Sequence, residues 1–295
     1  MHKEIRILNS DDVHYVEAMD TAIEDDYVVR IFDRLTTGNH RMYGLIIDNQ
    51  LVSMGGYTIY ANSYAVIGRL RSDQRFRGNN YATELVAHVL TEAFKLSDIQ
   101  WVGSITQEHN TPARRVLEKI GLTSHGMLHG AITKDTTALE TGAKPWNKIN
   151  SMERKKHWIR EVYLKSSAVF PFECYYSFPA SEDLFQEENL QDWSFYENDE
   201  QTRVRITKRD QKKHHYLHAV YPWSDFTSQK GLWETISVDY RKLAAETEDE
   251  TDNETYVWMD LTKEEAESLP ADHQFQLPSP WVLYGKGKEK FAEIM

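Results

Sequence analysis

A change of hydrophobic period near residue 75 constrains the fold of this 295-residue chain more than any other feature. Before it, residues 43–47, 51–60 and 64–71 have the character of strands separated by short turns, which predicts an antiparallel meander. After the segment RFRGNN, apolar residues recur at helical spacing from Ala82 to Phe94. The sequence therefore predicts a strand that leads through a short loop into an amphipathic helix.

Elements on either side extend this unit into a mixed sheet covered by helices. A strand is expected over residues 3–8 and another over 100–106. Pro112 at a first helical position begins a further helix, which Gly121 ends, and a strand over 127–133 follows. Two helices are expected between the first two strands, with these apolar residues inward: Val13, Val16, Met19, Ile23, Val28, Phe32 and Leu35. The predicted fold class is α+β, an α/β mixed sheet.

The second half of the chain repeats part of this order. Residues 136–166 are typical of a polar linker and a helix, so the expected domains are 1–135 and 167–295. Within the later domain, a strand, a long helix at 232–244, a strand, a short helix and a final strand follow one another as in residues 64–133. A degenerate second copy of the first domain and an unrelated α+β domain both explain this order.

Composition narrows the class of partner. The chain has 46 Asp and Glu against 34 Lys and Arg, a net charge of -12 that repels nucleic acid and anionic lipid, so neither is an expected partner. Cys174 is the sole cysteine, which excludes an internal disulfide and a cysteine-based zinc site. His214, His215 and His218 are expected to be solvated rather than metal ligands, so no metal is predicted. Without a signal-peptide core or a membrane-spanning run, we expect a cytoplasmic location.

The loop between the meander and the long helix is suited to bind a phosphate group. Backbone N–H groups converge at a helix start, the helix dipole favours negative charge, and arginines flank the glycine. The residues expected to bind an anionic cofactor are Leu70, Arg71, Ser72, Arg75, Arg77, Gly78, Asn79, Asn80, Tyr81, Ala82 and Thr83. A turn that binds nothing is the alternative that these residues alone leave open.

Two motifs carry a family resemblance. The segment around Arg75, Arg77 and Gly78 resembles the coenzyme-A-binding motif of the GNAT superfamily, Gln/Arg-x-x-Gly-x-Gly/Ala, although Asn80 stands where Gly or Ala is usual. Asn tolerates a positive φ, so the loop can still form. The segment NTPARRVLEKIGL at 110–122 resembles the family's Asn-x-x-Ala-x-x-hydrophobic-Tyr-Glu-Lys-x-Gly-Phe stretch. That second match adds two residues to the expected cofactor-binding set: Asn110 and Arg114.

The resemblance implies a function as well as a fold. For residues 1–135 it implies a GNAT acyl-CoA N-acyltransferase fold with acetyl-CoA as cosubstrate. It implies an N-acetyltransferase in which a primary amine, of unknown identity, attacks the thioester directly in a ternary complex. The oxyanion would accept a hydrogen bond from a backbone N–H of residues 70–72. A non-catalytic acyl-CoA-binding sensor or regulatory protein is the alternative function, and a homo-oligomer built on the second half is compatible with either.

The catalytic groups are not identified by sequence. Leu117 stands where many members of the family carry a Tyr that protonates the departing thiolate, so this acid is missing or supplied elsewhere. A base must also take a proton from the amine. Tyr60, Tyr64 and His109 are weak candidates for catalytic residues, and a structural role is the alternative for each.

Overall fold

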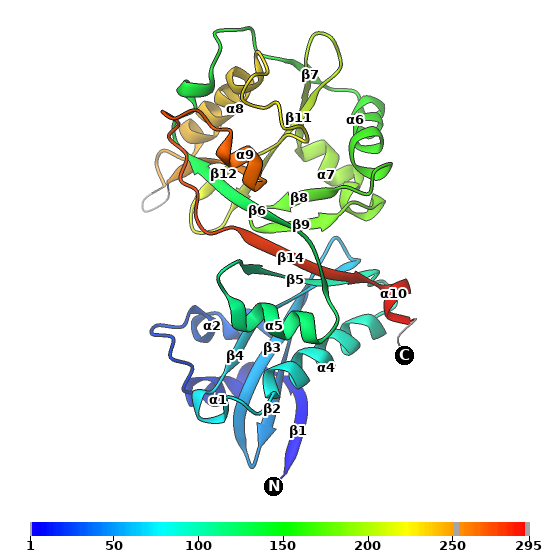
Figure 1. The fold of residues 1–295 in the computed structure, drawn as a ribbon, viewed down its shortest axis with the longest axis vertical. Helices are drawn as coiled ribbons and strands as arrows, with labels where there is room; N and C mark the ends of the chain where they lie inside the picture. Colours follow the sequence, from blue (N-terminus) through cyan, green and yellow to red (C-terminus); the bar gives the residue numbers. More distant parts are fainter. Residues whose placement is uncertain (1, 251–253, 293–295) are drawn as a thin grey trace. The chain divides into compact units, whose positions relative to one another are not determined.

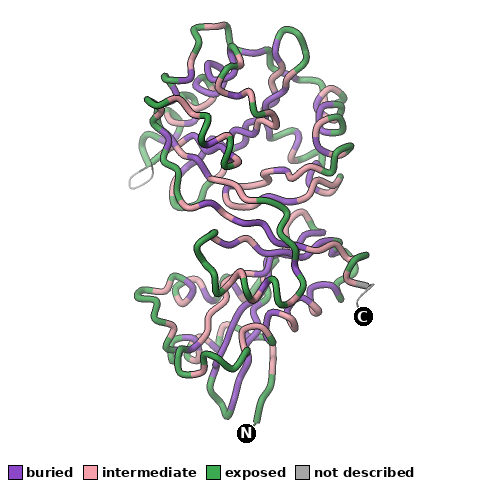
Figure 2. Tube along the Cα trace, viewed as in Figure 1, coloured by how far each residue is buried: buried purple, intermediate pink, exposed green. Residues whose placement is uncertain are grey.

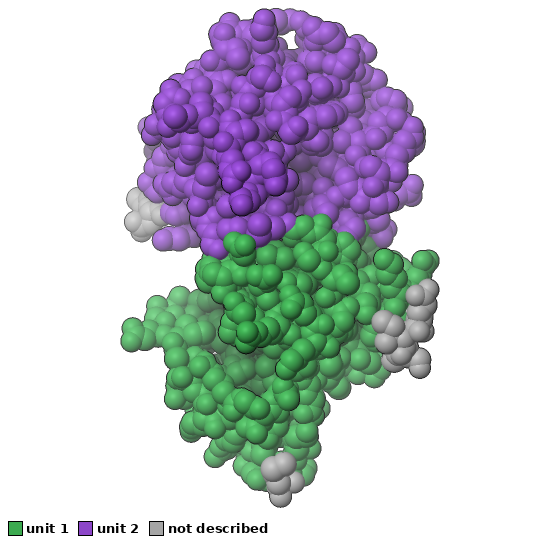
Figure 3. Space-filling view, in the orientation of Figure 1, with its two compact units in different colours: residues 1–126, 282–295 green, residues 127–281 purple. Residues whose placement is uncertain are grey.

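The protein forms two compact units, seen in the computed structural model, which describes residues 2–250 and 254–292 (Figures 1 and 3). Unit 1 comprises residues up to 126 together with those from 282 onward, and unit 2 comprises residues 127–281. The sequence-based division at residue 135 differs from this one because the end of the chain belongs with its beginning. Figure 2 shows that the strands of each unit are largely buried and the connecting loops largely exposed.

The sheet of unit 1 is the mixed sheet that the sequence predicts. Its order is β1 (Lys3–Leu8), β2 (His40–Ile47), β3 (Gln50–Tyr60), β4 (Tyr64–Ser72), β5 (Trp101–Gln107) and β14 (Trp281–Gly287). Strands β1 to β4 pair antiparallel, whereas β4 and β5 pair parallel. Because a parallel pair needs a crossover, the chain passes through a long helix between β4 and β5.

Helices cover both faces of this sheet. The helical elements of unit 1 are η1 (Ser10–Asp12), α1 (Val13–Glu17), α2 (Tyr27–Arg30), α3 (Phe32–Leu35), η2 (Gln74–Phe76), α4 (Tyr81–Lys95), α5 (Thr111–Lys119) and α10 (Lys288–Ala292). Residues of α1 to α3 form a buried cluster with Met42 and Met54 of the sheet. On the other face α4 buries the apolar stripe predicted from its sequence: Leu85, Val86, Val89, Leu90, Ala93 and Phe94.

The prediction for the first helix was wrong in its extent. Asn9 caps a short 3-10 turn, and α1 ends at Glu17, so the segment does not reach Ile23. Val16 and Met19 are buried as expected, but Ile23 is 48% exposed. The chain beyond α1 adopts irregular structure with positive φ at Ala22 and Asp25, which breaks the helical period.

The sheet of unit 2 has a similar construction. Its order is β6 (Thr123–Thr133), β13 (Thr255–Leu261), β12 (His215–Val220), β11 (Val204–Gln211), β10 (Ser194–Glu197) and β7 (Asn147–Ile149). The pair β12 and β13 is parallel, and the other pairs are antiparallel. The strand over 127–133 that was expected to close the first sheet thus pairs with β13.

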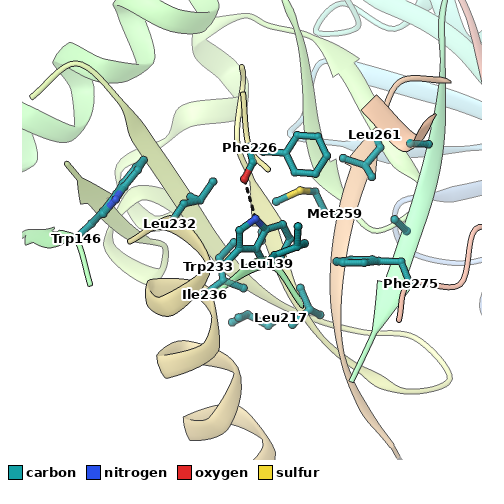
Figure 4. Packing of buried hydrophobic residues seen from close by; sticks show 14 of the residues in the cluster. Leu139, Trp146, Leu217, Phe226, Leu232, Trp233, Ile236, Met259, Leu261 and Phe275 are labelled. Carbon is teal, nitrogen blue, oxygen red and sulfur yellow. Dashed lines mark hydrogen bonds between the residues drawn. The ribbon is translucent and has the colours of Figure 1, made fainter. Parts of the chain in front are cut away.

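Helices, helical turns and a hairpin make up the remaining elements of unit 2. They are η3 (Thr137–Leu139), α6 (Met152–Ile159), the π-helical turn η4 (Arg160–Leu164), β8 (Val169–Glu173), β9 (Tyr176–Pro179), η5 (Glu182–Phe185), α7 (Glu187–Asp192), α8 (Leu232–Glu246) and α9 (Lys263–Glu267). The β8–β9 hairpin was not predicted. Trp233 of α8 lies fully buried in the core, and its indole donates a hydrogen bond to the carbonyl of Phe226 (Figure 4).

The two units share one order of strands and helices. Leading into the parallel pair, unit 1 has β1-β2-β3-β4-β5 and unit 2 has β7-β10-β11-β12-β13, with matching parallel and antiparallel senses. In each unit a fifteen-residue helix, α4 or α8, joins the two parallel strands. The strand that follows the parallel pair in sequence belongs largely to the other unit: β6 follows β5 and lies mostly in unit 2, and β14 follows β13 and lies mostly in unit 1. Among the described residues, no helix is long and apolar enough to cross a membrane.

Candidate functional site

Strands β4 and β5 separate partway along their length. Their pairing ends where Ile67 faces Ser104, although β4 continues to Ser72 and β5 to Gln107. A bulge in the pairing of β3 with β4 accompanies the separation, and Arg69 there adopts a left-handed φ of +55°. Beyond Ile67, β4 therefore presents a backbone edge that β5 does not pair with.

The N-terminus of α4 lies directly beyond this edge. Asn80 at the N-cap has a left-handed conformation, which Asn tolerates, and its side chain caps no backbone N–H. The N–H groups of the first helical turn consequently have no acceptor within the helix, and the helix dipole adds a partial positive charge there. Such a terminus binds anions readily.

A pocket of about 350 Å³ surrounds this helix start. Its lining residues come from β3, β4, the following loop, α4 and α5: Val52, Ser72, Phe76, Arg77, Gly78, Asn80, Tyr81, Ala82, Thr83, Pro112, Arg115, Val116 and Lys119. Three of them are cations, namely Arg77, Arg115 and Lys119, and the lining contains no carboxylate. The pocket therefore fits a polyanion such as the phosphates of coenzyme A.

About half of the predicted cofactor-binding residues line this pocket. They are Ser72, Arg77, Gly78, Asn80, Tyr81, Ala82 and Thr83. Arg115, Val116 and Lys119 were missed, although they were detectable. From Pro112 they follow at i+3, i+4 and i+7, so they share one face of α5.

The other predicted cofactor-binding residues do not line the pocket, and several have partners within the protein. Arg71 forms a bidentate ion pair with Asp26, with N–O distances of 2.6 and 2.8 Å, and this bond lowers the pKa of Asp26. Arg75 pairs with Asp73, whose pKa it lowers in the same way. Leu70 also lies outside the lining.

The remaining three of this set serve local structure. The side-chain amide of Asn79 donates to the carbonyl of Phe76 at 3.0 Å. Asn110 caps α5 by accepting the N–H of Ala113 at 3.3 Å. Arg114 donates to the hydroxyl of Tyr284, in β14, at 3.1 Å.

The predicted catalytic candidates lie apart from one another. Tyr60 and Tyr64 face each other across the turn between β3 and β4, at the opposite end of β4 from Ser72. Tyr64 is buried against Trp101. His109 is exposed in the loop before α5, at the end of β5 where the strands have separated. Leu117 is a buried core side chain of α5.

Unit 2 has the corresponding helix start, but the chain itself covers it. α8 begins after Gly231, which has a left-handed φ of +78°. A Cβ at Gly231 would lie 2.3 Å from the carbonyl oxygen of Lys144, so that segment lies directly against the helix start. The Glu234 carboxylate in the first turn accepts the N–H groups of Thr141 at 2.5 Å and Ala143 at 3.0 Å.

Trp146 joins the segment of residues 141–146 to the start of α8 by two hydrogen bonds. Its backbone N–H donates to Thr235 Oγ1, and its indole donates to the carbonyl of Lys230, both at 2.8 Å. Burial disfavours the charge on Glu234, but the hydrogen bonds outweigh it and lower the pKa of this carboxyl. In unit 2, therefore, a carboxylate and residues 141–146 occupy the place where unit 1 has an open cationic pocket.

The prediction of solvated histidines in unit 2 was wrong for two of the three. His218 is fully buried and lies 2.7 Å from Asp260 Oδ2, and burial lowers its pKa. His215 is also buried and contacts Glu250 at 2.7 Å. Both belong to β12, a strand buried on both sides. Among the described residues, no group of three His, Cys, Asp or Glu side chains is placed to hold a metal ion.

Comparison with known proteins agrees with this fold. The protein resembles in fold a GCN5-related N-acetyltransferase from Sphaerobacter thermophilus, at a TM-score of 0.54 and 15% identity, over 97% of this chain and 96% of the other. It also resembles a candidate acetyltransferase from Pyrococcus horikoshii, at a TM-score of 0.50 and 12% identity, over 97% and 89%. No curated protein matches the sequence. The family model described as acetyltransferase (GNAT) family matches residues 8–122, and the solved structures share the mixed α+β fold.

Proposed function

We propose that the protein is an N-acetyltransferase that binds acetyl-CoA in unit 1 and transfers the acetyl group to a primary amine. The observation that carries the proposal is the pocket at the start of α4. It combines uncapped backbone N–H groups with Arg77, Arg115 and Lys119, and no carboxylate lines it. These groups would hold the phosphates of the cosubstrate.

The separated strands suggest how the thioester is placed. With the phosphates at α4, the pantetheine arm would run along the unpaired edge of β4, past Ser72 toward Gly68. A backbone N–H of residues 70–72 would donate to the carbonyl oxygen as negative charge develops on it. The amine nitrogen forms the new C–N bond and loses one proton, while the C–S bond breaks and sulfur leaves as a thiolate with the bonding electrons.

No side chain at the α5 position of Leu117 can protonate the departing sulfur. A thiolate is a tolerable leaving group near neutral pH, so transfer does not require that acid. We therefore expect turnover without it. Acetyl-CoA binding without turnover on peptides, polyamines and aminoglycosides would instead favour the sensor function.

Calorimetric titration of acetyl-CoA tests the proposal first. The parent is expected to bind, and Gly78→Trp should abolish binding because the indole would fill the pocket. Gly38→Trp is the matched control, since both glycines have a positive φ and no atom within 4 Å of an added Cβ, yet Gly38 does not line the pocket. Lys119→Glu should weaken binding by charge reversal, whereas Lys213→Glu in unit 2 should not. An unchanged affinity in Gly78→Trp would sink the proposal.

A further inference from the structure

Arg69 lies just beyond the point where β4 leaves β5, the stretch of β4 along which the proposed function places the thioester. Its left-handed φ of +55° is unusual for a residue with a side chain and costs about 1–2 kcal/mol. Strain of this kind persists only where the surrounding structure enforces it, and it gathers at functional sites.

The guanidinium of Arg69 is held in place by a chain of polar groups across three strands. Its Nη1 donates to Thr58 Oγ1 on β3 at 2.6 Å. Thr58 is 5% exposed, and its hydroxyl also lies 2.8 Å from Nδ1 of His40 on β2. Burial, together with the positive charges of Arg69 and Arg34, lowers the pKa of His40, so this ring is neutral near pH 7. The guanidinium is thus anchored by neutral groups.

No described carboxylate compensates the charge on Arg69. Two carboxylates beside this part of the chain neutralise other arginines, because Asp26 pairs with Arg71 and Asp73 pairs with Arg75. Within the described residues Arg69 forms no ion pair, and its guanidinium donates to Thr58.

Space is available beside this arginine. A Cβ added at Gly68, the preceding residue, would meet no atom within 4 Å, and Arg69 is only partly buried. A guanidinium with free N–H groups and open space binds a carboxylate well, because its planar fork matches the two oxygens. A cationic acceptor, by contrast, would be repelled at short range.

We infer that the acceptor is an amine that also carries a carboxylate, an amino acid, and that Arg69 binds this carboxylate. The inference rests on the proposed function and deepens it by naming the acceptor class. Thr58 and His40 act as positioning residues that fix the guanidinium. The same positive charge disfavours the ammonium form of the bound amine, which must be neutral to attack.

Matched acceptors test the inference with the intact protein. Acetyl-CoA turnover is measured with the proteinogenic amino acids, with the carboxamide of each active one, and with spermidine and a lysine peptide. The amino acid is expected to exceed its carboxamide in kcat/KM by about 10- to 100-fold, since a charged hydrogen bond is lost in the amide. Arg69→Gln should erase this preference, and Arg69→Lys should retain part of it, while acetyl-CoA affinity stays unchanged in both.

Arg41→Gln is the control variant, because Arg41 lies on the neighbouring strand β2 and donates only to the carbonyls of Gly38 and His40. It should keep the preference for the carboxylate. Turnover that favours spermidine or the peptide, or an Arg69→Gln variant that slows acid and amide equally, would overturn the inference and leave the proposed function standing. A parent that binds no acetyl-CoA, or acetylates no amine, would refute both.

Discussion

A pair of glycine substitutions measures how firmly unit 2 closes its own helix start. Gly78 and Gly231 both have a left-handed φ, at +87° and +78°. Alanine at either position costs about 1–2 kcal/mol for the backbone conformation alone. The surroundings differ, because an added Cβ at Gly78 meets nothing within 4 Å, whereas at Gly231 it would lie 2.3 Å from the carbonyl oxygen of Lys144.

The contacts that must shift set the size of the effect. Moving the Lys144 segment away from Gly231 stretches the two hydrogen bonds of Trp146, each worth about 0.5–1.5 kcal/mol. It also disturbs the hydrogen bonds that the Glu234 carboxylate accepts, worth about 1.5–3 kcal/mol for a charged group. Gly231→Ala should therefore lower the free energy of unfolding by at least about 2 kcal/mol more than Gly78→Ala.

Urea unfolding separates the two variants. Far-UV circular dichroism follows both units, and tryptophan fluorescence follows unit 2, because Trp101 is the one tryptophan outside it. Gly231→Ala should shift the fluorescence transition and leave acetyl-CoA affinity unchanged. Gly78→Ala should weaken acetyl-CoA binding and leave the fluorescence transition unchanged. Equal losses of stability in the two variants would refute the reasoning, since they would mean that residues 141–146 move away from Gly231 at no cost in free energy.

Three further outcomes follow from the same contacts. Calorimetry should find one acetyl-CoA per chain, because Glu234 and residues 141–146 occupy the second helix start, and a stoichiometry of two would contradict this. Asp26→Asn should lower the free energy of unfolding at pH 7. Because the pKa of Asp26 is depressed and its protonation removes the Arg71 pair in the parent, the difference between parent and variant should shrink as pH falls below 3.8. A difference that stays constant down to pH 2 in urea titrations would contradict this. A chain that ends at residue 135 lacks β14 and should bind no acetyl-CoA by calorimetry, whereas tight binding would show that β14 is dispensable.

Local signals predicted the elements around the candidate site well. The meander, α4 and α5 depend on short turns, a helical period and Pro112 at a helix start, and all of these are encoded within a few residues. The same locality explains why the pocket-lining residues Arg77, Gly78 and Asn80 to Thr83 were among those predicted. It also explains the failure at Ile23, because α1 already ends at Glu17 and irregular structure with a positive φ at Ala22 follows, although the apolar residues alone would continue the period.

Partners distant in sequence account for most of the misses. Arg71, which is predicted to bind the cofactor, forms an ion pair with Asp26, and nothing near Arg71 in the sequence indicates that pair. His218 was expected to be solvated because no nearby Asp/Glu pattern completes a set of metal ligands, yet β12 is buried and Asp260 from β13 accepts its hydrogen bond. In both cases a tertiary contact decided the role of a side chain whose local context permitted either.

The C-terminal strand shows how such a contact reaches the candidate site. The hydroxyl of Tyr284 in β14 donates to Glu118 at 2.8 Å and accepts from Arg114 at 3.1 Å, so it bridges one face of α5. The neighbouring face of that helix carries Arg115 and Lys119 into the pocket. A helix of nine residues has little stability of its own, and its orientation depends on such packing. The end of the chain therefore supports the cationic side of a pocket whose motifs all lie in the first half, which is why the motifs alone do not define the domain.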